Sequence, residues 1–174
     1  MNRALQQLVL IFALFAAWLP LAHAHKPSDS YLSLTVADSG VSGRWDIALR
    51  DIDFAIGLDA DGNGEIDWGE VRRRHADIAA YALARLSVSA DGATCRIEAG
   101  AQQIDEHTDG AYTVIPLALR CNAGTPAQLA VDYRLFADLD PQHRGLLNLQ
   151  AQGSTRSAVL GPQAPTQSFD LKAP

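Results

Sequence analysis

The chain is organised around one acidic stretch, Asp59-Ala60-Asp61-Gly62-Asn63-Gly64-Glu65-Ile66-Asp67-Trp68-Gly69-Glu70. It matches the calcium-loop pattern D-x-[DN]-x-[DN]-G-x5-E at every specified position. Calcium is a hard cation that prefers oxygen ligands from a closely wrapped loop. The expected metal ligands are the side chains of Asp59, Asp61, Asn63 and Glu70, the backbone carbonyl of Glu65, and Asp67 through a water molecule. Gly64 stands where the loop must turn sharply, so the pattern predicts a Ca²⁺ site.

A solvated acidic turn is the plain alternative, because Asp, Asn and Gly are common in turns. The residues that follow favour the metal loop. Ile66 is apolar at the eighth position, and Asp67 with Glu70 forms a capping-box pattern at the start of a helix. The stretch is therefore interpreted as a single EF-hand calcium loop.

Residues 1–24 are predicted to be a secretory signal peptide. Arg3 precedes an apolar run at 8–19, and Ala22-His23-Ala24 is a cleavage site of the A-x-A type. A membrane anchor is the alternative, but this apolar run is too short to span a bilayer. The mature chain is expected to begin at His25, to be periplasmic or secreted, and to have no transmembrane segment of its own.

The charge pattern limits the partners of the chain. The formal net charge is −6, and residues 51–70 contain seven acidic residues and no Lys or Arg. Acidity is therefore concentrated around the loop, and no basic stripe suggests nucleic-acid binding. Sequence patterns of hydrolases, zinc proteases and phosphate-binding loops are absent, so we expect no enzymatic activity.

Cys95 and Cys121 are the only cysteines, and in an exported chain they are expected to form a disulfide. Placing them opposite each other in an antiparallel pair gives an apolar face throughout. The pairs would be Ile97 with Leu119, Ala99 with Leu117 and Ala101 with Ile115. The chain would reverse near His107-Thr108-Asp109-Gly110.

Most of the mature chain alternates apolar and polar residues with the period of a strand. The clearest segments are 32–36, 41–49, 129–135, 146–151 and 155–160, separated by turn residues at 38–40, 91–92 and 122–124. This spacing predicts a mainly β fold, an antiparallel β-sandwich over residues 25–161. Pro116 predicts an edge strand or a bulge. Residues 162–174 are expected to be a Pro-containing C-terminal tail.

One segment has helical periodicity instead. Val71, Ile78, Ala82 and Leu86 fall on one face, which predicts one long helix over residues 68–86. The EF-hand loop is thus expected to lie in an insert at about 51–86, between strands of the sandwich. No second loop of this pattern is present to pair with it.

Several short motifs resemble those of a known family. They are His25-Lys26-Pro27-Ser28-Asp29-Ser30-Tyr31-Leu32, the run from Gly43 to Asp51, Gly57-Leu58-Asp59, Asp109-Gly110-Ala111-Tyr112, Tyr133-Arg134-Leu135-Phe136 and the run from Asp138 to Gly145. Together they resemble the exported N-terminal domain of HupE/UreJ-like bacterial membrane proteins. The resemblance covers nearly all of residues 23–160. It implies a domain that accompanies a membrane protein, in a family that includes proposed nickel permeases. Its larger members continue into membrane helices, whereas this sequence continues into Gly161-Pro162-Gln163-Ala164-Pro165.

Two functional hypotheses follow. The first is a calcium-binding, non-catalytic accessory or sensor module, with a membrane protein as one potential partner. The alternative is a nickel- or copper-binding accessory protein for a membrane metal transporter. Its metal would lie at His25 or at Asp138, Asp140 and His143, because imidazole nitrogen suits these metals. The simpler alternative is that His25 lies in a frayed terminus and that residues 138–143 form a polar turn with His143 exposed.

Overall fold

Apolar residues alternate with polar ones along the first two strands, and this places one face of the larger sheet in the core. Strand β1 (Asp29–Ala37) buries Leu32, Leu34 and Val36, and strand β2 (Gly40–Ala48) buries Trp45 and Ile47. The computed structural model describes residues 28–122 and 124–172. The predicted signal peptide and His25 lie outside the described residues.

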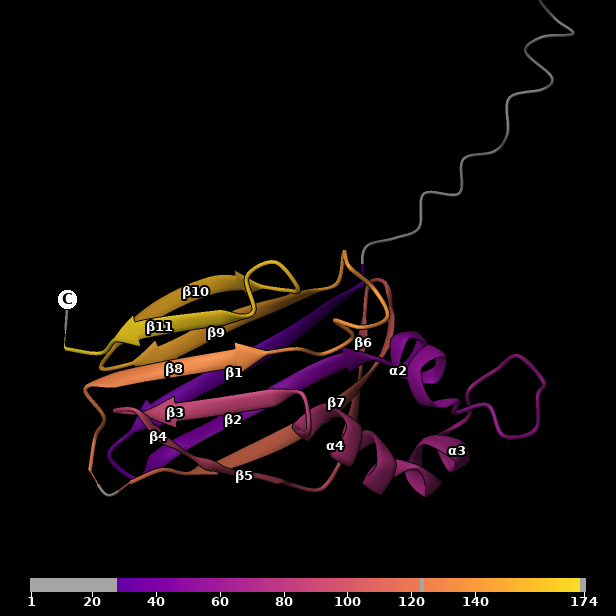
Figure 1. The fold of residues 1–174 in the computed structure, drawn as a ribbon. Coiled ribbons are helices and arrows are strands. Elements are labelled where there is room, and N and C mark those ends of the chain that lie inside the picture. Colours follow the sequence, from indigo (N-terminus) through magenta and orange to yellow (C-terminus); the bar gives the residue numbers. More distant parts are fainter. Residues whose placement is uncertain (1–27, 123, 173–174) are drawn as a thin grey trace, which may run out of the picture.

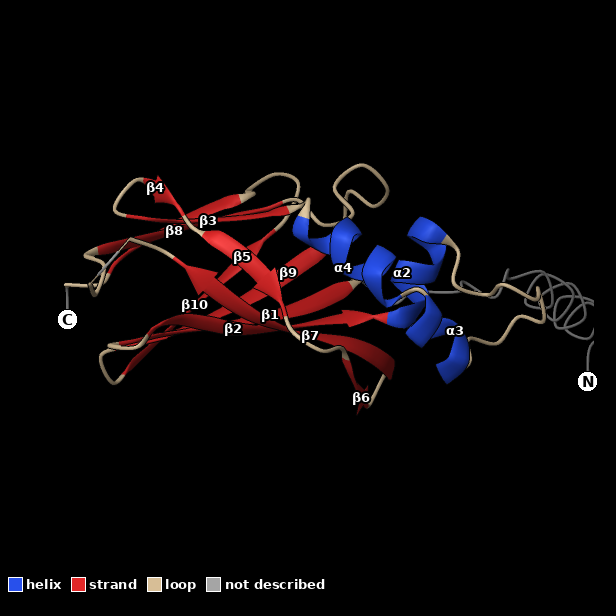
Figure 2. Ribbon diagram, turned by 90° about the horizontal axis from the view of Figure 1, so that it is seen from below, coloured by secondary structure: helices blue, strands red, loops and turns tan. Residues whose placement is uncertain are grey.

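Two sheets pack face to face, as the predicted sandwich requires (Figures 1 and 2). The larger sheet has the order β10-β9-β1-β2-β7-β5, with β6 also paired to β7, and the smaller has the order β11-β8-β3-β4. The remaining strands are β3 (Leu86–Ala90), β4 (Ala93–Thr94), β5 (Arg96–Ala99), β6 (Gln103–His107), β7 (Gly110–Arg120), β8 (Gln128–Tyr133), β9 (Arg144–Ala151), β10 (Ser154–Leu160) and β11 (Thr166–Asp170).

The prediction of a purely antiparallel sandwich is wrong at one place. Strand β1 pairs with β9 in parallel, whereas the other strand pairs among the described residues are antiparallel. The chain leaves β8 in the smaller sheet and enters β9 in the larger one, beside the first strand. Long connections of this kind are not encoded in the local alternation of side chains.

The predicted turns lie between strands. Asp91 and Gly92 join β3 to β4 with φ values of 49° and 80°, a left-handed pair that Asp and Gly tolerate. Thr108 and Asp109 form the two-residue turn between β6 and β7, where His107 pairs with Gly110. The Asp-Gly signal is therefore displaced by one residue from the centre of the turn.

Pro116 marks a break in the strands that pair with β7. Strand β7 has neighbours on both sides, so it is not an edge strand. Its outer partner is β5 up to Ala99 and β6 from Gln103, with Gly100 donating a backbone hydrogen bond to the Pro116 carbonyl at 2.7 Å. The intervening residues shift the register, so the bulge alternative describes this region and the expected pairing of Ala101 with Ile115 does not form.

Three helices fill the insert at one end of the sandwich (Figure 2). They are α2 (Leu49–Ile56), α3 (Trp68–Arg73) and α4 (His75–Leu83). The predicted single long helix is wrong, because it is interrupted at Arg74, and Leu86 already belongs to strand β3. Ile78 and Ala82 of α4 are buried, as the periodicity predicted.

The segment expected to be a C-terminal tail contains strand β11, which pairs with β8 at the edge of the smaller sheet. Phe169 and Leu171 are buried in the core, so this segment completes the sandwich. None of the helices in the described part of the chain has the length and hydropathy needed to cross a membrane.

Candidate metal centre

The 59–70 loop begins after α2 and ends in the first turn of α3, projecting from the helical end of the molecule (Figure 1). Its first half winds around the carboxylate of Asp59. This carboxylate accepts backbone hydrogen bonds from Gly62 at 2.7 Å, Asn63 at 3.2 Å and Gly64 at 2.8 Å. These bonds, that of Gly64 first, lower the pKa of the Asp59 carboxyl and keep it ionised. The first predicted ligand is therefore charged and oriented inward.

Two glycines permit this winding. Gly62 and Gly64 have φ values of 72° and 83°, in the left-handed region that other residues enter at a cost. The sequence pattern demanded Gly only at position 64. Gly62, two residues earlier, also adopts the left-handed conformation.

Glu70, the last residue of the loop, connects its two ends. It is 2% exposed, and its two oxygens accept backbone hydrogen bonds from Ala60 at 2.7 Å and Asp67 at 3.0 Å. Asp67 returns the contact by accepting from the Glu70 backbone N–H at 2.8 Å, which completes the predicted capping box of α3. A nearly buried carboxylate is thus held at the point where the two ends of the loop meet.

The folding of the loop brings three predicted ligands together. One carboxylate oxygen from each of Asp59, Asp61 and Glu70 lies within 4.8 Å of the others. Asn63 lies next to this group, donating from its side-chain amide to Asp61 at 3.1 Å. Glu65 is exposed, as expected for a residue that contributes its backbone carbonyl, and the Asp67 side chain is used in the cap.

The donor set fits a hard cation. The three converging atoms are carboxylate oxygens, which calcium prefers. Ion pairs between described residues involve none of the loop carboxylates. Like charges held this close repel one another unless a cation lies between them. A divalent ion would therefore relieve a repulsion that no ion pair within the described residues compensates.

Two residues that sequence reasoning missed hold the ends of the loop. Asp53 accepts backbone hydrogen bonds from Leu58 at 2.6 Å and Asp59 at 3.1 Å, just before the first ligand. Arg74, just after the loop, donates to the carbonyls of Gly57 at 2.7 Å and Ile56 at 3.2 Å. The sequence signal that could have identified these two residues is their position, a few residues outside the motif.

Among the alternative transition-metal ligands, the described residues Asp138, Asp140 and His143 do not converge. Asp138 faces Arg85 at 3.6 Å, and Asp140 accepts from the Gln142 backbone. The expectation of an exposed His143 is wrong, since this side chain is 1% exposed and bonded to Ser28 and Tyr133, both at 2.6 Å. The polar-turn interpretation therefore holds for the two aspartates but not for the histidine.

Cys95 and Cys121 form the predicted disulfide, at a sequence separation of 26 residues. The register beside them is the expected one, with Ile97 opposite Leu119 and Ala99 opposite Leu117. The bridge lies in the sandwich, outside the helical insert, so its role is structural.

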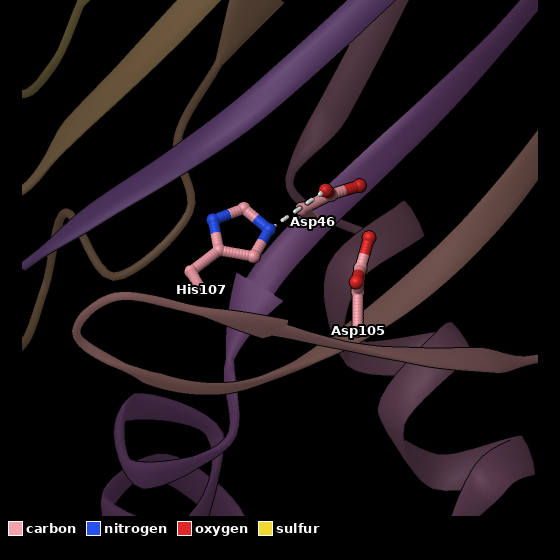
Figure 3. Close-up of side chains that lie close together, drawn as sticks. All are labelled: Asp46, Asp105 and His107. Carbon is pink, nitrogen blue, oxygen red and sulfur yellow. Dashed lines mark ion pairs between the residues drawn. The ribbon is translucent and has the colours of Figure 1, made fainter.

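A second group of metal-ligand side chains was not predicted from the sequence. Asp46, Asp105 and His107 also place their donor atoms within 4.8 Å of one another (Figure 3). The three residues belong to strands β2 and β6, which are separated by more than fifty positions in the sequence, so no local motif signals them.

No protein-family model matches the chain, and no curated protein matches it. The resemblance to the exported domain of HupE/UreJ-like proteins therefore stays a prediction from its short motifs.

Proposed function

We propose that this protein is an exported calcium-binding β-sandwich module that binds one Ca²⁺ in the 59–70 loop. The observation that carries the proposal is the convergence of Asp59, Asp61 and the buried Glu70 in a loop of EF-hand pattern. The role is that of a non-catalytic accessory or sensor, in which calcium orders the helical insert at one end of a rigid sandwich.

The chemistry of the site supports calcium over a softer metal. The loop offers oxygen donors only, and nickel or copper would gain more from imidazole nitrogen. A single hand in an exported module is expected to bind weakly, with Kd on the order of 10⁻⁴–10⁻³ M. Affinity in this range suits compartments where calcium is abundant.

Two exposed aromatic side chains, one before the loop and one within it, support a role in contacting a partner. Phe54 on α2 is 77% exposed and Trp68 on α3 is 50% exposed. Ordering of the loop by calcium would reduce the relative movement of these two helices. The proposed partner contact is therefore on the helical end of the molecule.

The test is a calcium titration of chelator-treated protein by calorimetry, with Glu70→Gln and Glu65→Gln as a matched pair. Both variants remove one carboxylate charge from the same loop. Glu70→Gln also removes an expected bidentate ligand, so its Kd should rise about tenfold or more. Glu65→Gln changes an exposed side chain and leaves the backbone carbonyl, which is the expected ligand, in place. Its Kd should therefore change by less than about threefold.

Equal effects of the two variants on Kd would contradict the proposal, because they would show that Glu70 contributes only its negative charge and is not a ligand. A stoichiometry of two would also contradict it. Parallel titrations with nickel and copper distinguish the alternative accessory function, which requires tight binding of those metals and none of calcium.

A further inference from the structure

The outer face of the larger sheet carries a cluster of ligand-type side chains away from the 59–70 loop. Asp46 on β2 pairs with Val114 on β7, and Val114 pairs in turn with Gln103 on β6. Side chains at paired positions, and at every second residue from them, share one face of a sheet. Asp105 and His107 follow Gln103 at intervals of two, so all three ligand-type side chains lie on the face of Asp46.

The three side chains converge, as Figure 3 shows. The His107 imidazole Nε2 lies 3.3 Å from the Asp46 carboxylate Oδ2, and the Asp105 carboxylate comes within 4.8 Å of both ligand atoms. Two ligands on one tetrahedral ion, each about 2.0–2.2 Å from it, lie roughly 3.3–3.6 Å apart. The His107–Asp46 distance already has this value, and Asp105 would have to move closer to complete the set.

The imidazole is held in place by aromatic rings. His107 stacks on Tyr112 with ring centroids 4.1 Å apart, and Tyr31 lies 5.3 Å from it on another side. Asp46 is only 6% exposed. A buried carboxylate and a fixed imidazole form a preorganised pair, which reduces the cost of ordering the ligands on binding.

A cation already occupies the space between the carboxylates. The Arg44 guanidinium donates to Asp46 at 2.7 and 2.8 Å and to Asp105. Two carboxylates and one guanidinium leave an excess of one negative charge when His107 is neutral. The Arg44 side chain is 45% exposed, so it can move into solvent without losing hydration.

We propose that Asp46, Asp105 and His107 form a second metal site that takes a divalent transition-metal ion in exchange for the Arg44 guanidinium. The mixed donor set of one imidazole nitrogen and two carboxylates suits zinc-like ions and is unsuited to calcium, which takes oxygen. This site is independent of the proposed calcium loop and of the residues at 138–143. The guanidinium keeps the carboxylates together until the ion replaces it.

The test is a zinc titration by calorimetry in chelator-treated, calcium-free protein that carries Glu70→Gln. This background weakens any zinc binding by the 59–70 loop, so failure of the calcium proposal does not affect the result. We expect one zinc ion per chain. His107→Gln should weaken zinc binding by about tenfold or more, as the loss of a ligand exceeds the usual effect of losing a supporting contact.

Arg44→Gln separates a metal site from a structural ion-pair network. It removes the competing cation, so zinc affinity should increase by about threefold or more. It also leaves the buried Asp46 without its guanidinium partner, so the melting temperature should fall in chelator and recover when zinc is added. The double variant Arg44→Gln/His107→Gln should show no recovery.

Control variants address the other histidines. His75→Gln on helix α4 and His25→Gln before strand β1 make the same substitution outside the cluster and should leave zinc affinity unchanged. Asp105→Asn is a second ligand variant at an exposed position, and it should weaken binding. Unchanged zinc affinity in His107→Gln and Asp105→Asn, or loss of binding in His25→Gln alone, would overturn the proposal. Weaker binding by Arg44→Gln without thermal recovery would do the same.

Discussion

A chain of hydrogen bonds through the core defines the state of His143. The Asp51 carboxylate can only accept, so Ser28 donates to it and the Ser28 oxygen accepts from the Nδ1–H of His143. The distances are 3.2 Å from Trp45 to Ser30, 2.6 Å from Ser30 to Tyr133, 2.6 Å from Tyr133 to His143, 2.6 Å from His143 to Ser28 and 2.8 Å from Ser28 to Asp51. Burial lowers the pKa of His143 and so favours the neutral imidazole, which carries its proton on Nδ1 and accepts from Tyr133 at Nε2.

This arrangement predicts a loss of stability in mild acid. Burial lowers the pKa of the His143 imidazole, against the opposing effect of Asp51 and Asp140. The unfolded chain, with an imidazole pKa of 6.5, binds the proton before the folded protein does. The free energy of unfolding should thus be fully retained above pH 6.5 and fall below it, by up to about 1.4 kcal/mol per pH unit until the pH reaches the folded-state pKa.

Urea unfolding at several pH values between 5 and 7.5 measures this dependence. His143→Gln should lower stability at neutral pH and flatten the slope, while His75→Gln serves as the control histidine. A slope in His143→Gln as steep as in the wild type would show that other groups cause the pH dependence.

The helical insert is held as a unit by contacts at its element ends. Arg74 ends α3 and, from the same position, reaches back to the carbonyls at the end of α2. Its Nε also donates to Asp77 in the first turn of α4 at 2.6 Å. The break in the predicted long helix thus positions one arginine to connect all three helices around the 59–70 loop.

Arg74→Gln should therefore weaken calcium binding although Arg74 is not an expected ligand. The variant loses hydrogen bonds that bring the two ends of the loop together, so Kd should rise by about three- to tenfold. Arg72→Gln, an exposed arginine on α3, removes the same charge and is the control. Both are measured by the calcium titration described above, and equal Kd values for the two variants would contradict the role given to Arg74.

The whole molecule is joined across its two sheets near the disulfide. The chain crosses from β4 in the smaller sheet to β5 in the larger sheet at Cys95, and the partner Cys121 follows directly after β7. The Cys95 backbone N–H also bonds to the Val88 carbonyl of the smaller sheet at 2.8 Å. The bridge therefore fixes the crossing point of the chain against the end of strand β7 in the larger sheet.

Removing the bridge should lower stability and leave calcium binding nearly unchanged. The double variant Cys95→Ala/Cys121→Ala should lose roughly 3–4 kcal/mol of unfolding free energy, the chain-entropy value for a loop of this length. Urea unfolding of the two proteins gives the difference, and non-reduced peptide mapping checks the linkage. Two freely alkylated thiols in the native protein would contradict the linkage.

Local patterns in the sequence were sufficient for several features. Alternation along 32–36 and 129–135 predicted strands, and the apolar faces of Ile97 and Leu119 predicted their register, because a strand repeats every two residues and a wrong register exposes its apolar side. The loop pattern at 59–70 predicted which carboxylates come together, because twelve consecutive residues carry the whole donor set.

Only the tertiary structure decided the features that depend on distant segments. The parallel pairing of β1 with β9 depends on where the connection between β8 and β9 ends. The burial of His143, which lies in that connection, depends on it too. The cluster of Asp46, Asp105 and His107 exists because β7 lies between β2 and β6. Which strands become neighbours is set by the packing of the whole core, and no short stretch of sequence contains that information.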